Sequence, residues 1–527
     1  MEATPQIKKD EKGESLVIIF FILVYFVVLV RTAWISDDAY ISFRTIDNFI
    51  NGYGLTFNIG ERVQSFTNPL WVLILAFFYS FTNEIFNTSL LISMIISLVA
   101  VSLYAFKLSK TPLVSVFGVT VLMLSKAFID YSTSGLENPM NHLLIVLFFS
   151  IYFITKKNIQ KWFFLTLIAS LCMVNRMDTI LLFLPALTFY FFEGLRSHFN
   201  IKFFIKKAVI GLLGFIPFMV WELFSLVYYG FPFPNTAYAK LNTGISSIEY
   251  ILQGVFYFFN SMDVDPITPF IIIIGICFPF IIRDKRLYPV SIGVIFYVIY
   301  TIKVGGDFMS GRFLAAPLLC SVIALSFLQI SLHRYQFVFI LSIVVLLGFV
   351  SPYPTLLSNS KYGLDRSFKE LVDHRGIADE RGVYYPHSGF LRQSRTNEMP
   401  NFRTISTALE DRASGKKVTV VRMLGFYSFF VGPHVHVIDQ LALSDPLLAR
   451  LPMDKSKKWR IGHFNRTIPD GYIETIEKGE ILIKDPDVAA YYEKLSMVIR
   501  GEILDTSRFK EIWNFNTGKY NSLVLPK

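Results

Sequence analysis

Long apolar runs that recur along the chain constrain this sequence more than any other feature. The first run, Ser15–Trp34, has about 20 residues, enough for a helix to cross the ~30 Å hydrocarbon core of a bilayer. Hydrophobic residues make up 53% of the chain, charged residues only 17%, and 53 residues are phenylalanine. Soluble domains carry about a quarter charged residues. The sequence therefore predicts a polytopic α-helical membrane protein.

The apolar runs predict about eleven membrane spans, and the charges between them predict their orientation. With the N-terminus in the cytoplasm, the basic loops fall on the cytoplasmic side and the C-terminal tail lies outside. The predicted spans are 15–34, 86–106, 112–130, 138–155, 161–175, 178–194, 208–228, 268–283, 287–303, 313–332 and 336–351. The basic residues assigned to the cytoplasmic side are Lys8, Lys9, Lys12, Lys107, Lys110, Lys156, Lys157, Arg196, Lys202, Lys206, Lys207, Lys285, Arg286 and Arg334.

Two further apolar stretches, Pro69–Ser80 and Tyr250–Met262, are short for a span. Counting the first as a span would invert every later loop and place the basic clusters outside, against the positive-inside rule. We therefore expect both stretches to form helices that lie at the outer interface.

The character of the chain changes after the last predicted span. The remaining residues have an ordinary soluble composition, and β-like runs occur at Val418–Arg422 and Val435–Asp439. The predicted organisation is a transmembrane domain over 1–351, a first outer loop over 35–85 within it, and a soluble α/β domain over 352–527 outside the membrane.

Charge and cysteine content exclude two classes of function. The net charge of +10 arises from short loops between apolar runs rather than from a basic stripe with interleaved aromatics, so we predict no nucleic-acid binding. Cys172, Cys277 and Cys320 lie inside apolar runs and are interpreted as small buried hydrophobes, not as a disulfide or metal set. His434 and His436 share one face of a predicted strand, but no third ligand is indicated and no metal site is predicted.

The unusual polar residues gather on the outer side of the predicted membrane domain, several of them at helix ends. Ionisable groups near a membrane are costly and usually have a partner or a function. Cations and carboxylates that converge on one face suggest an anionic ligand and a proton acceptor. These residues are Asp37, Asp38, Glu137, Arg176, Asp178, Asn235, Lys240, Asp307 and Arg312.

The adjacent acids Asp37 and Asp38, directly after the first span, are open to two interpretations. Ser and Asp are favoured at helix N-termini, so the pair could simply cap a solvated helix. The functional interpretation is a general base or a metal-binding carboxylate beside the membrane. A similar choice applies to Arg176 and Asp178, which could bind a ligand or simply pair with each other.

Six segments, found in the same order over about four hundred residues, resemble a known family. They resemble a bacterial group of GT-C glycosyltransferases whose members include the mycobacterial terminal β-1,2-arabinofuranosyltransferases. The segments are 37–71 (DDAYISFRTIDNFINGYGLTFNIGERVQSFTNPLW), 134–139 (SGLENP), 233–240 (FPNTAYAK), 305–313 (GGDFMSGRF), 445–452 (DPLLARLP) and 459–464 (WRIGHF).

The resemblance implies a cell-envelope enzyme of the bacterial inner membrane. It implies transfer of a sugar, arabinofuranose-like, from a polyprenyl-phosphate donor to a glycan acceptor outside the cytoplasm, with inversion at the anomeric carbon. Asp37 or Asp38 is then the catalytic base, and the sequence does not decide between them. The candidate contacts to the donor phosphate or sugar are Arg44, Arg176, Lys240 and Arg312. The other candidate pocket residues are Tyr40, Glu137, Asp178, Asn235 and Asp307.

The chemistry of such a transfer fits these residue types. The leaving group is a lipid phosphate, so cations must hold its charge, and a carboxylate must accept the acceptor's proton. No resident cofactor is expected beyond the donor lipid, while a divalent metal remains compatible with the acidic pair. A transporter or flippase of lipid-linked sugars is the alternative, although no two related halves are apparent. The sequence leaves the sugar and the acceptor open.

Overall fold

A computed structural model describes residues 11–156, 158–193, 200–241, 243–328, 334–394 and 397–524. Four residues of the predicted cytoplasmic loops, and the end of the predicted span 313–332, lie outside these ranges. The four residues are Lys8, Lys9, Lys157 and Arg196.

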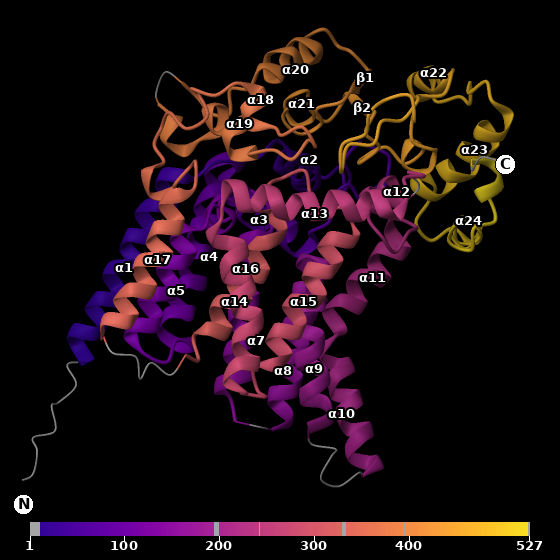
Figure 1. Ribbon diagram of the computed structural model, residues 1–527. Helices are drawn as coiled ribbons and strands as arrows, with labels where there is room; N and C mark the ends of the chain where they lie inside the picture. Colours follow the sequence, from indigo (N-terminus) through magenta and orange to yellow (C-terminus); the bar gives the residue numbers. More distant parts are fainter. Residues whose placement is uncertain are drawn as a thin grey trace, which may run out of the picture.

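The described chain forms a bundle of long helices with a layer of short helices and loops over one end (Figure 1). The first described residues lie at the opposite end of the bundle from this layer. Each predicted span coincides with helical structure in the bundle. The bundle elements are α1 (Glu11–Thr32), α4 (Ile85–Leu103), η1 (Tyr104–Leu108), α5 (Pro112–Leu124), α6 (Lys126–Asp130), α7 (Asn138–Ile154), α8 (Ile159–Asn175), η2 (Met177–Thr179), α9 (Ile180–Glu193), α10 (Ile201–Gly214), α11 (Ile216–Tyr228), α14 (Ile267–Ile282), α15 (Tyr288–Lys303), η3 (Arg312–Leu314), α16 (Ala315–Leu325) and α17 (Arg334–Val350).

Length and composition alone mark fewer spans than the sequence predicts. Among the described residues, Gly13–Thr32 and Ile85–Leu108 are long and apolar enough to cross a membrane, and two bent helix pairs raise the number to at most 4. The remaining apolar helices have 10–17 residues. The prediction of about eleven spans therefore stays a prediction.

The helical structure at the predicted span 208–228 extends beyond it and is bent within it. The helix begins at Ile201, so Lys202 and Lys206 lie on a helix and not in a loop. The chain then bends by 55° between α10 and α11. Pro217 stands in the first turn of α11, where its missing N–H is tolerated but the preceding helix cannot continue unbroken.

The two short apolar stretches form helices at the upper end of the bundle. They are α3 (Pro69–Thr82) and α13 (Ser247–Val264). In Figure 1, α13 runs across the bundle, and it makes an angle of 113° with α14. This arrangement is the one expected of a helix lying at an interface.

The layer over the bundle consists of α2 and α12 together with residues 352–524, which we call the cap. Its two strands pair in parallel with Val418 opposite His436, which confirms both predicted strands to within one residue at an end. Helices and loops make up the rest of the described cap. The elements of the whole layer are α2 (Asp37–Ile50), α12 (Asn235–Leu241), η4 (Thr355–Leu357), α18 (Phe368–Leu371), α19 (Glu380–Ser388), η5 (Phe390–Arg392), α20 (Arg403–Ala413), β1 (Val418–Val421), α21 (Gly425–Phe430), β2 (His436–Asp439), η6 (Leu448–Arg450), α22 (Tyr472–Lys478), α23 (Pro486–Arg500), α24 (Thr506–Asn516) and η7 (Asn521–Leu523).

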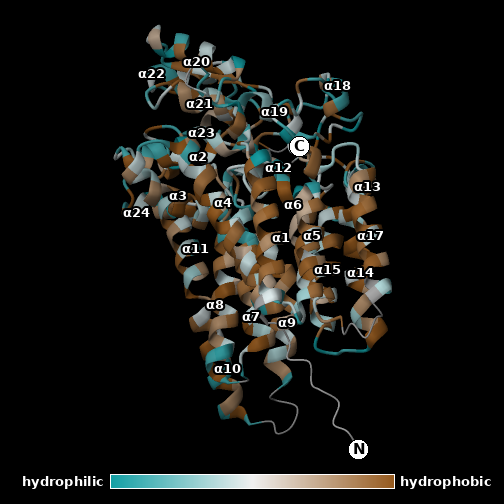
Figure 2. Cartoon of the chain, turned by 90° about the vertical axis from the view of Figure 1, so that its left-hand side faces the viewer, coloured by the Kyte–Doolittle hydropathy of each residue, from teal (hydrophilic) through white to brown (hydrophobic). Residues whose placement is uncertain are grey.

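The cap and the bundle share one apolar core. Buried cap residues such as Tyr385, Phe426 and Phe464 belong to the same cluster as Trp34 and Phe128 of the bundle side. Figure 2 shows the bundle as largely hydrophobic and the hydrophilic residues concentrated toward its two ends and in the cap. Because the core is continuous, the cap packs directly against the bundle over shared buried side chains.

A buried ionic cluster strengthens this attachment. Lys126 Nζ donates to Asp130 and, at 2.8 Å, to Asp379 of the cap. Arg381 Nε lies 2.6 Å from Asp130, and Arg366 Nη1 lies 3.0 Å from Asp379. These side chains are at most 9% exposed, so removal of any one leaves a charge uncompensated in a medium that solvates it poorly.

Replacing Asp379 with asparagine should therefore destabilise the protein. Lys126 and Arg366 would lose a buried carboxylate, a loss that costs about 3–5 kcal/mol. Thermal unfolding in detergent micelles measures the effect as a lowered Tm. Asp470→Asn is the matched control, because Asp470 and Lys484 are 80% and 76% exposed and such pairs contribute about 0–1 kcal/mol. Equal Tm values for the two variants would contradict the role of the cluster.

Candidate active site

The acidic pair lies in the first turn of α2. Ser36 is the N-cap of this helix, and its hydroxyl accepts the backbone N–H of Ala39. Successive residues of an α-helix point about 100° apart. Asp37 and Asp38 therefore face different surroundings, although they are adjacent in the sequence.

Asp37 is hydrogen-bonded to the cap. Its carboxylate accepts the backbone N–H groups of Gly425 at 3.0 Å and Phe426 at 2.8 Å, the first residues of α21. A Cβ on Gly425 would lie 1.7 Å from the carbonyl oxygen of Asp37, so only glycine allows this approach. Burial raises the pKa of Asp37 to about 6, and the nearby charge of Asp38 adds to the shift.

Asp38 makes no hydrogen bond or ion pair with the residues that the structure describes, and its side chain remains partly accessible. Burial raises its pKa; the charge of Arg312 opposes this shift, that of Asp307 adds to it, and that of Lys240 opposes it. Asp38 is thus a carboxylate with unused acceptor capacity that interacts electrostatically with Arg312 and Lys240.

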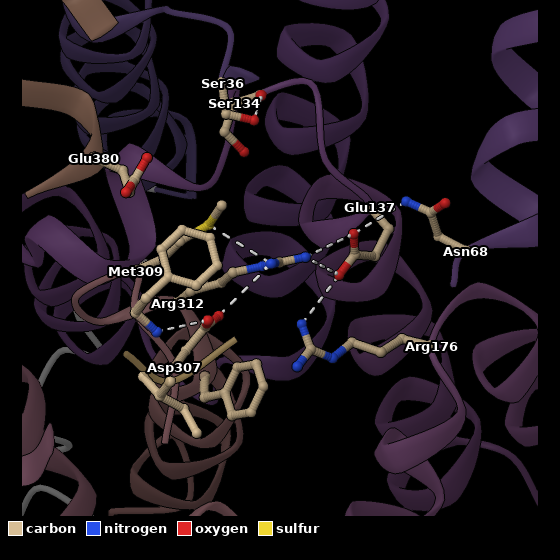
Figure 3. Close-up of polar contacts among 12 residues, drawn as sticks. Ser36, Asn68, Ser134, Glu137, Arg176, Asp307, Met309, Arg312 and Glu380 are labelled. Carbon is tan, nitrogen blue, oxygen red and sulfur yellow. Dashed lines mark hydrogen bonds and ion pairs between the residues drawn. The ribbon is translucent and has the colours of Figure 1, made fainter. Parts of the chain in front are cut away.

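Glu137, the N-cap of α7, stands at the centre of a group of charged side chains (Figure 3). Arg176 Nη1 and Arg312 Nη2 each donate to Glu137 Oε1 at 3.0 Å, and Asn68 donates to Oε2 at 3.2 Å. Burial alone would raise the pKa of Glu137, but Arg312 and Arg176 lower it to about 2. One ionised carboxylate therefore holds two guanidinium groups at the end of the bundle.

Arg176 and Asp178 form a bidentate pair, as one of the two interpretations of the sequence expected. Arg176 Nε donates to Asp178 Oδ1 at 2.9 Å and Nη2 donates to Oδ2 at 3.1 Å. The hydroxyl of Tyr297 also donates to Asp178, and the guanidinium of Arg176 lies 4.3 Å from the ring centre of Phe313. Most donors of Arg176 are thus already used within the protein.

The double-glycine turn before Asp307 explains the position of that residue. Gly306 has φ +70°, and a Cβ there would lie 2.5 Å from the ring of Tyr257. The turn brings Asp307 Oδ2 to 3.6 Å from Arg312 Nη1, as Figure 3 shows. Asp307 Oδ1 accepts the N–H of Phe308 at 2.8 Å, so Asp307 orients the guanidinium of Arg312 from the side opposite Glu137.

Lys240, at the end of α12, is accessible to solvent and makes no hydrogen bond or ion pair with the described residues. Desolvation lowers its pKa, although its charge interacts favourably with Asp307 and Asp38. Arg312 Nε is buried and, like Lys240, has no hydrogen-bond partner among the described atoms. Two cations with unused donors therefore lie in the electrostatic field of Asp38.

Three cap residues reach this site and were not assigned a role from the sequence. Arg460 Nη2 lies 3.6 Å from Glu380 Oε1, and the ring of His463 packs edge-on against Phe308 at 4.5 Å between centres. Burial raises the pKa of Glu380 well above its usual range, against the pull of Arg460 and with the help of Asp38. Arg460 and His463 belong to the WRIGHF segment, which could have suggested them, whereas no motif marks Glu380.

The structure places three predicted site residues away from this cluster. Arg44 is buried and donates to the backbone carbonyls of Phe57, Ser428, Gly432 and Val435. The prediction that Arg44 contacts the donor phosphate has no support in this placement, because its guanidinium is used to join α2 to the loop after α21.

Asn235 and Tyr40 are also used in attaching the cap. The side-chain amide of Asn235 donates to the carbonyls of Ala442, Leu443 and Asp445. The ring of Tyr40 lies 4.7 Å from that of Phe426. Both side chains therefore hold the cap in register with the bundle and do not line the charged cluster.

The described residues contain no group of three or more His, Cys, Asp or Glu side chains placed to hold a metal ion. The site is instead a set of alternating carboxylates and cations. Such a set can hold an anion against its cations and accept a proton on its free carboxylate.

Comparisons with known proteins agree with this chemistry. The family model for dolichyl-phosphate-mannose-protein mannosyltransferase matches residues 67–221. The terminal β-(1→2)-arabinofuranosyltransferase of Mycobacterium tuberculosis is 24% identical over 533 residues, covering 84% of this chain and 82% of that protein. The protein of the same name from Corynebacterium glutamicum is 23% identical over 351 residues, covering 56% of this chain and 48% of that protein.

Two solved structures match this chain with TM-scores below 0.5. The archaeal oligosaccharyltransferase AglB from Archaeoglobus fulgidus, in complex with an inhibitory peptide and a dolichol-phosphate, has a TM-score of 0.46 and 12% identity, covering 83% of this chain and 65% of its own. ArnT from Cupriavidus metallidurans, bound to undecaprenyl phosphate, has a TM-score of 0.44 and 12% identity, covering 84% of this chain and 77% of its own.

The family match and the relatives indicate that the chain is a glycosyltransferase. Within that class, the chain is similar to the terminal β-(1→2)-arabinofuranosyltransferases, which confirms the resemblance carried by the six sequence segments.

Glu137→Gln tests the centre of the site. Glu137 has a pKa of about 2 against an ordinary value of 4.5, so its ionised form contributes about 3 kcal/mol to folding. This contribution is present above pH 4.5 and is lost as the pH falls toward 2. The wild type should therefore lose Tm over that range, and Glu137→Gln should have a lower Tm at neutral pH with less further loss in acid.

Asp284→Asn is the control for this measurement, because its partner Arg286 is 73% exposed and the pair contributes little. If the Tm of Glu137→Gln fell with pH as much as that of the wild type, the ionised carboxylate of Glu137 would not be what stabilises the two guanidinium groups.

Proposed function

We propose that this protein is an inverting glycosyltransferase that moves a sugar from a polyprenyl-phosphate donor to a glycan acceptor, with Asp38 as the catalytic base. The observation that carries the proposal is that the two carboxylates of the acidic pair have different partners. The carboxylate of Asp37 accepts two N–H groups of α21. Asp38 accepts no hydrogen bond from any described residue and interacts electrostatically with Arg312 and Lys240.

The proposed reaction follows from these positions. An acceptor hydroxyl oxygen attacks the anomeric carbon from the face opposite the phosphate, and Asp38 takes the hydroxyl proton. The bond from the anomeric carbon to the phosphate oxygen breaks, and polyprenyl phosphate leaves with the electron pair. A single displacement inverts the configuration at the anomeric carbon.

Arg312 and Lys240 are the proposed contacts to the phosphate of the donor. Lys240 has a free ammonium group, and Arg312 keeps an unpaired Nε–H. Charge-assisted hydrogen bonds to a phosphate strengthen as the leaving group gains charge. Arg176, with its donors on Asp178 and Glu137, is a positioning residue.

The two cations can carry the leaving-group charge without a resident cofactor, so we propose none. We assign the donor sugar as arabinofuranose-like on the similarity to the mycobacterial and corynebacterial enzymes. We further propose that the N-terminus is cytoplasmic and that the cap and the site lie outside the cytoplasmic membrane, in the service of cell-envelope synthesis.

A transfer assay in liposomes tests the proposal. Polyprenyl-phosphate sugars, labelled in the sugar, are supplied one at a time with envelope glycans, with and without a chelator. Transfer of label to the glycan supports the enzyme and identifies the sugar. Label that crosses the bilayer without transfer would instead support the alternative, a flippase or transporter.

The paired variants Asp38→Asn and Asp37→Asn locate the base. Asp38→Asn should lose about 10²–10⁴-fold in turnover, the range that general base catalysis contributes, at an unchanged Tm. Asp37→Asn should lower the Tm, because its amide NH₂ would face a backbone N–H of α21, and should reduce turnover much less. Wild-type turnover in Asp38→Asn would refute the assignment.

The pH profile gives a separate test. Because the pKa of Asp38 is raised, the acid limb of kcat/KM should lie at higher pH than an ordinary aspartate would produce. Lys240→Met should move this limb to still higher pH, since it removes a cation that favours the ionised form. Lys455→Met, which changes an exposed neighbour of Gly244, is the control and should leave the limb in place. An unshifted acid limb in Lys240→Met would contradict the electrostatic effect of Lys240 on Asp38.

A further inference from the structure

The C-terminal helix α24 presents an apolar face that nothing in the described chain covers. Trp513 is 71% exposed and Leu504, just before the helix, is 78% exposed. Ile503 and Phe509 are exposed as well. Phe509 and Trp513 are four residues apart, so they lie on the same side of the helix.

Other residues of α24 fix the helix to the end of a bundle helix. Arg508 donates to the carbonyls of Val227 at 2.7 Å and Tyr228 at 2.8 Å, the last residues of α11. Asn516 donates to the carbonyl of Gly230 at 2.9 Å. A Cβ on Gly230 would lie 2.3 Å from Val498 and 3.3 Å from Ile512, so this contact is close and leaves the position of α24 well determined.

Both overall views place α24 at the same level of the molecule. In Figure 1 and Figure 2 it lies lower than the other helices of the C-terminal segment, level with α3 and the upper end of α11. The helix to which it is fixed, α11, exposes Val220, Leu223 and Phe224 along its length. The uncovered face of α24 therefore lies at the level of the upper end of a bundle helix that also exposes apolar side chains.

Tryptophan and other amphipathic side chains concentrate at the level of the lipid headgroups. A helix with one apolar face and one polar face lies in that plane with its apolar face in the boundary of the acyl chains. In α24 the sequence supplies the polar neighbours too, since Lys510 is exposed beside Phe509.

We propose that α24 is an interfacial helix, with Trp513, Phe509 and Leu504 inserted into the outer leaflet of the membrane. The partner is the lipid bilayer itself. The inference does not depend on the proposed reaction; it depends on the bundle being embedded in a membrane and, for the choice of leaflet, on the proposed orientation. Its effect is to fix the height and tilt of the cap, and with it Arg460 and His463, relative to the lipid surface.

Site-directed spin labelling tests the proposal on the full chain in phosphatidylcholine and phosphatidylglycerol liposomes. Cys172 and Cys320 are buried, and the exposed Cys277 is replaced by serine. A nitroxide is attached at Trp513→Cys or at Leu504→Cys, a second site on the same face. Its accessibility to oxygen, which concentrates in lipid, is compared with that to a neutral nickel chelate present on both sides of the bilayer.

Leu409→Cys on α20 is the matched control, because Leu409 is an exposed apolar residue, 47% accessible, in the part of the cap farthest from the bundle. Labels at 513 and 504 should be reached more by oxygen than by nickel, and the label at 409 more by nickel. Nickel access at 513 and 504 equal to that at 409 would overturn the proposal. Low access of both reagents would also overturn it, since it would show that protein covers the helix.

Discussion

Two hydrogen bonds from the backbone of α21 to the carboxylate of Asp37 determine how the rest of the site is arranged. They join the first turn after the first bundle helix to the cap, and they use the acceptor capacity of one member of an acidic pair. Because adjacent helical residues diverge by about 100°, fixing Asp37 toward the cap directs Asp38 toward the cations. The same contact therefore sets the placement of the cap and the direction in which Asp38 points.

The charges around Asp38 are arranged so that some are satisfied and some are not. Glu137 and Asp178 accept most of the donors of Arg176, and Glu137 also accepts from Arg312. Lys240 remains without a partner among the described residues. A site in which every cation was paired would gain nothing from binding an anion. The unpaired donors, held in place by the paired ones, are what makes anion binding favourable before any substrate arrives.

Much of the helical architecture could be predicted from the sequence, since apolar runs in the membrane report directly on helices. The residues of the charged cluster could also be found, because they stand out against an apolar background. The separate roles of Asp37 and Asp38 could not, since they depend on Gly425, far along the chain. Arg44 was misplaced for the same reason: its partners are backbone carbonyls, which carry no sequence signal. Glu380 lies in no motif and was missed.

The contact between Asp37 and α21 joins distant parts of the chain, and this affects when the site can form during synthesis. The residues joined by the Asp37 carboxylate are 388 and 389 positions apart, and Arg460 and His463 lie farther still along the chain. A ribosome must therefore finish almost the whole polypeptide, and most of it must be delivered across or into the membrane, before the site exists. Shortened products of synthesis would carry the bundle and most of its cations but would lack the assembled charged cluster.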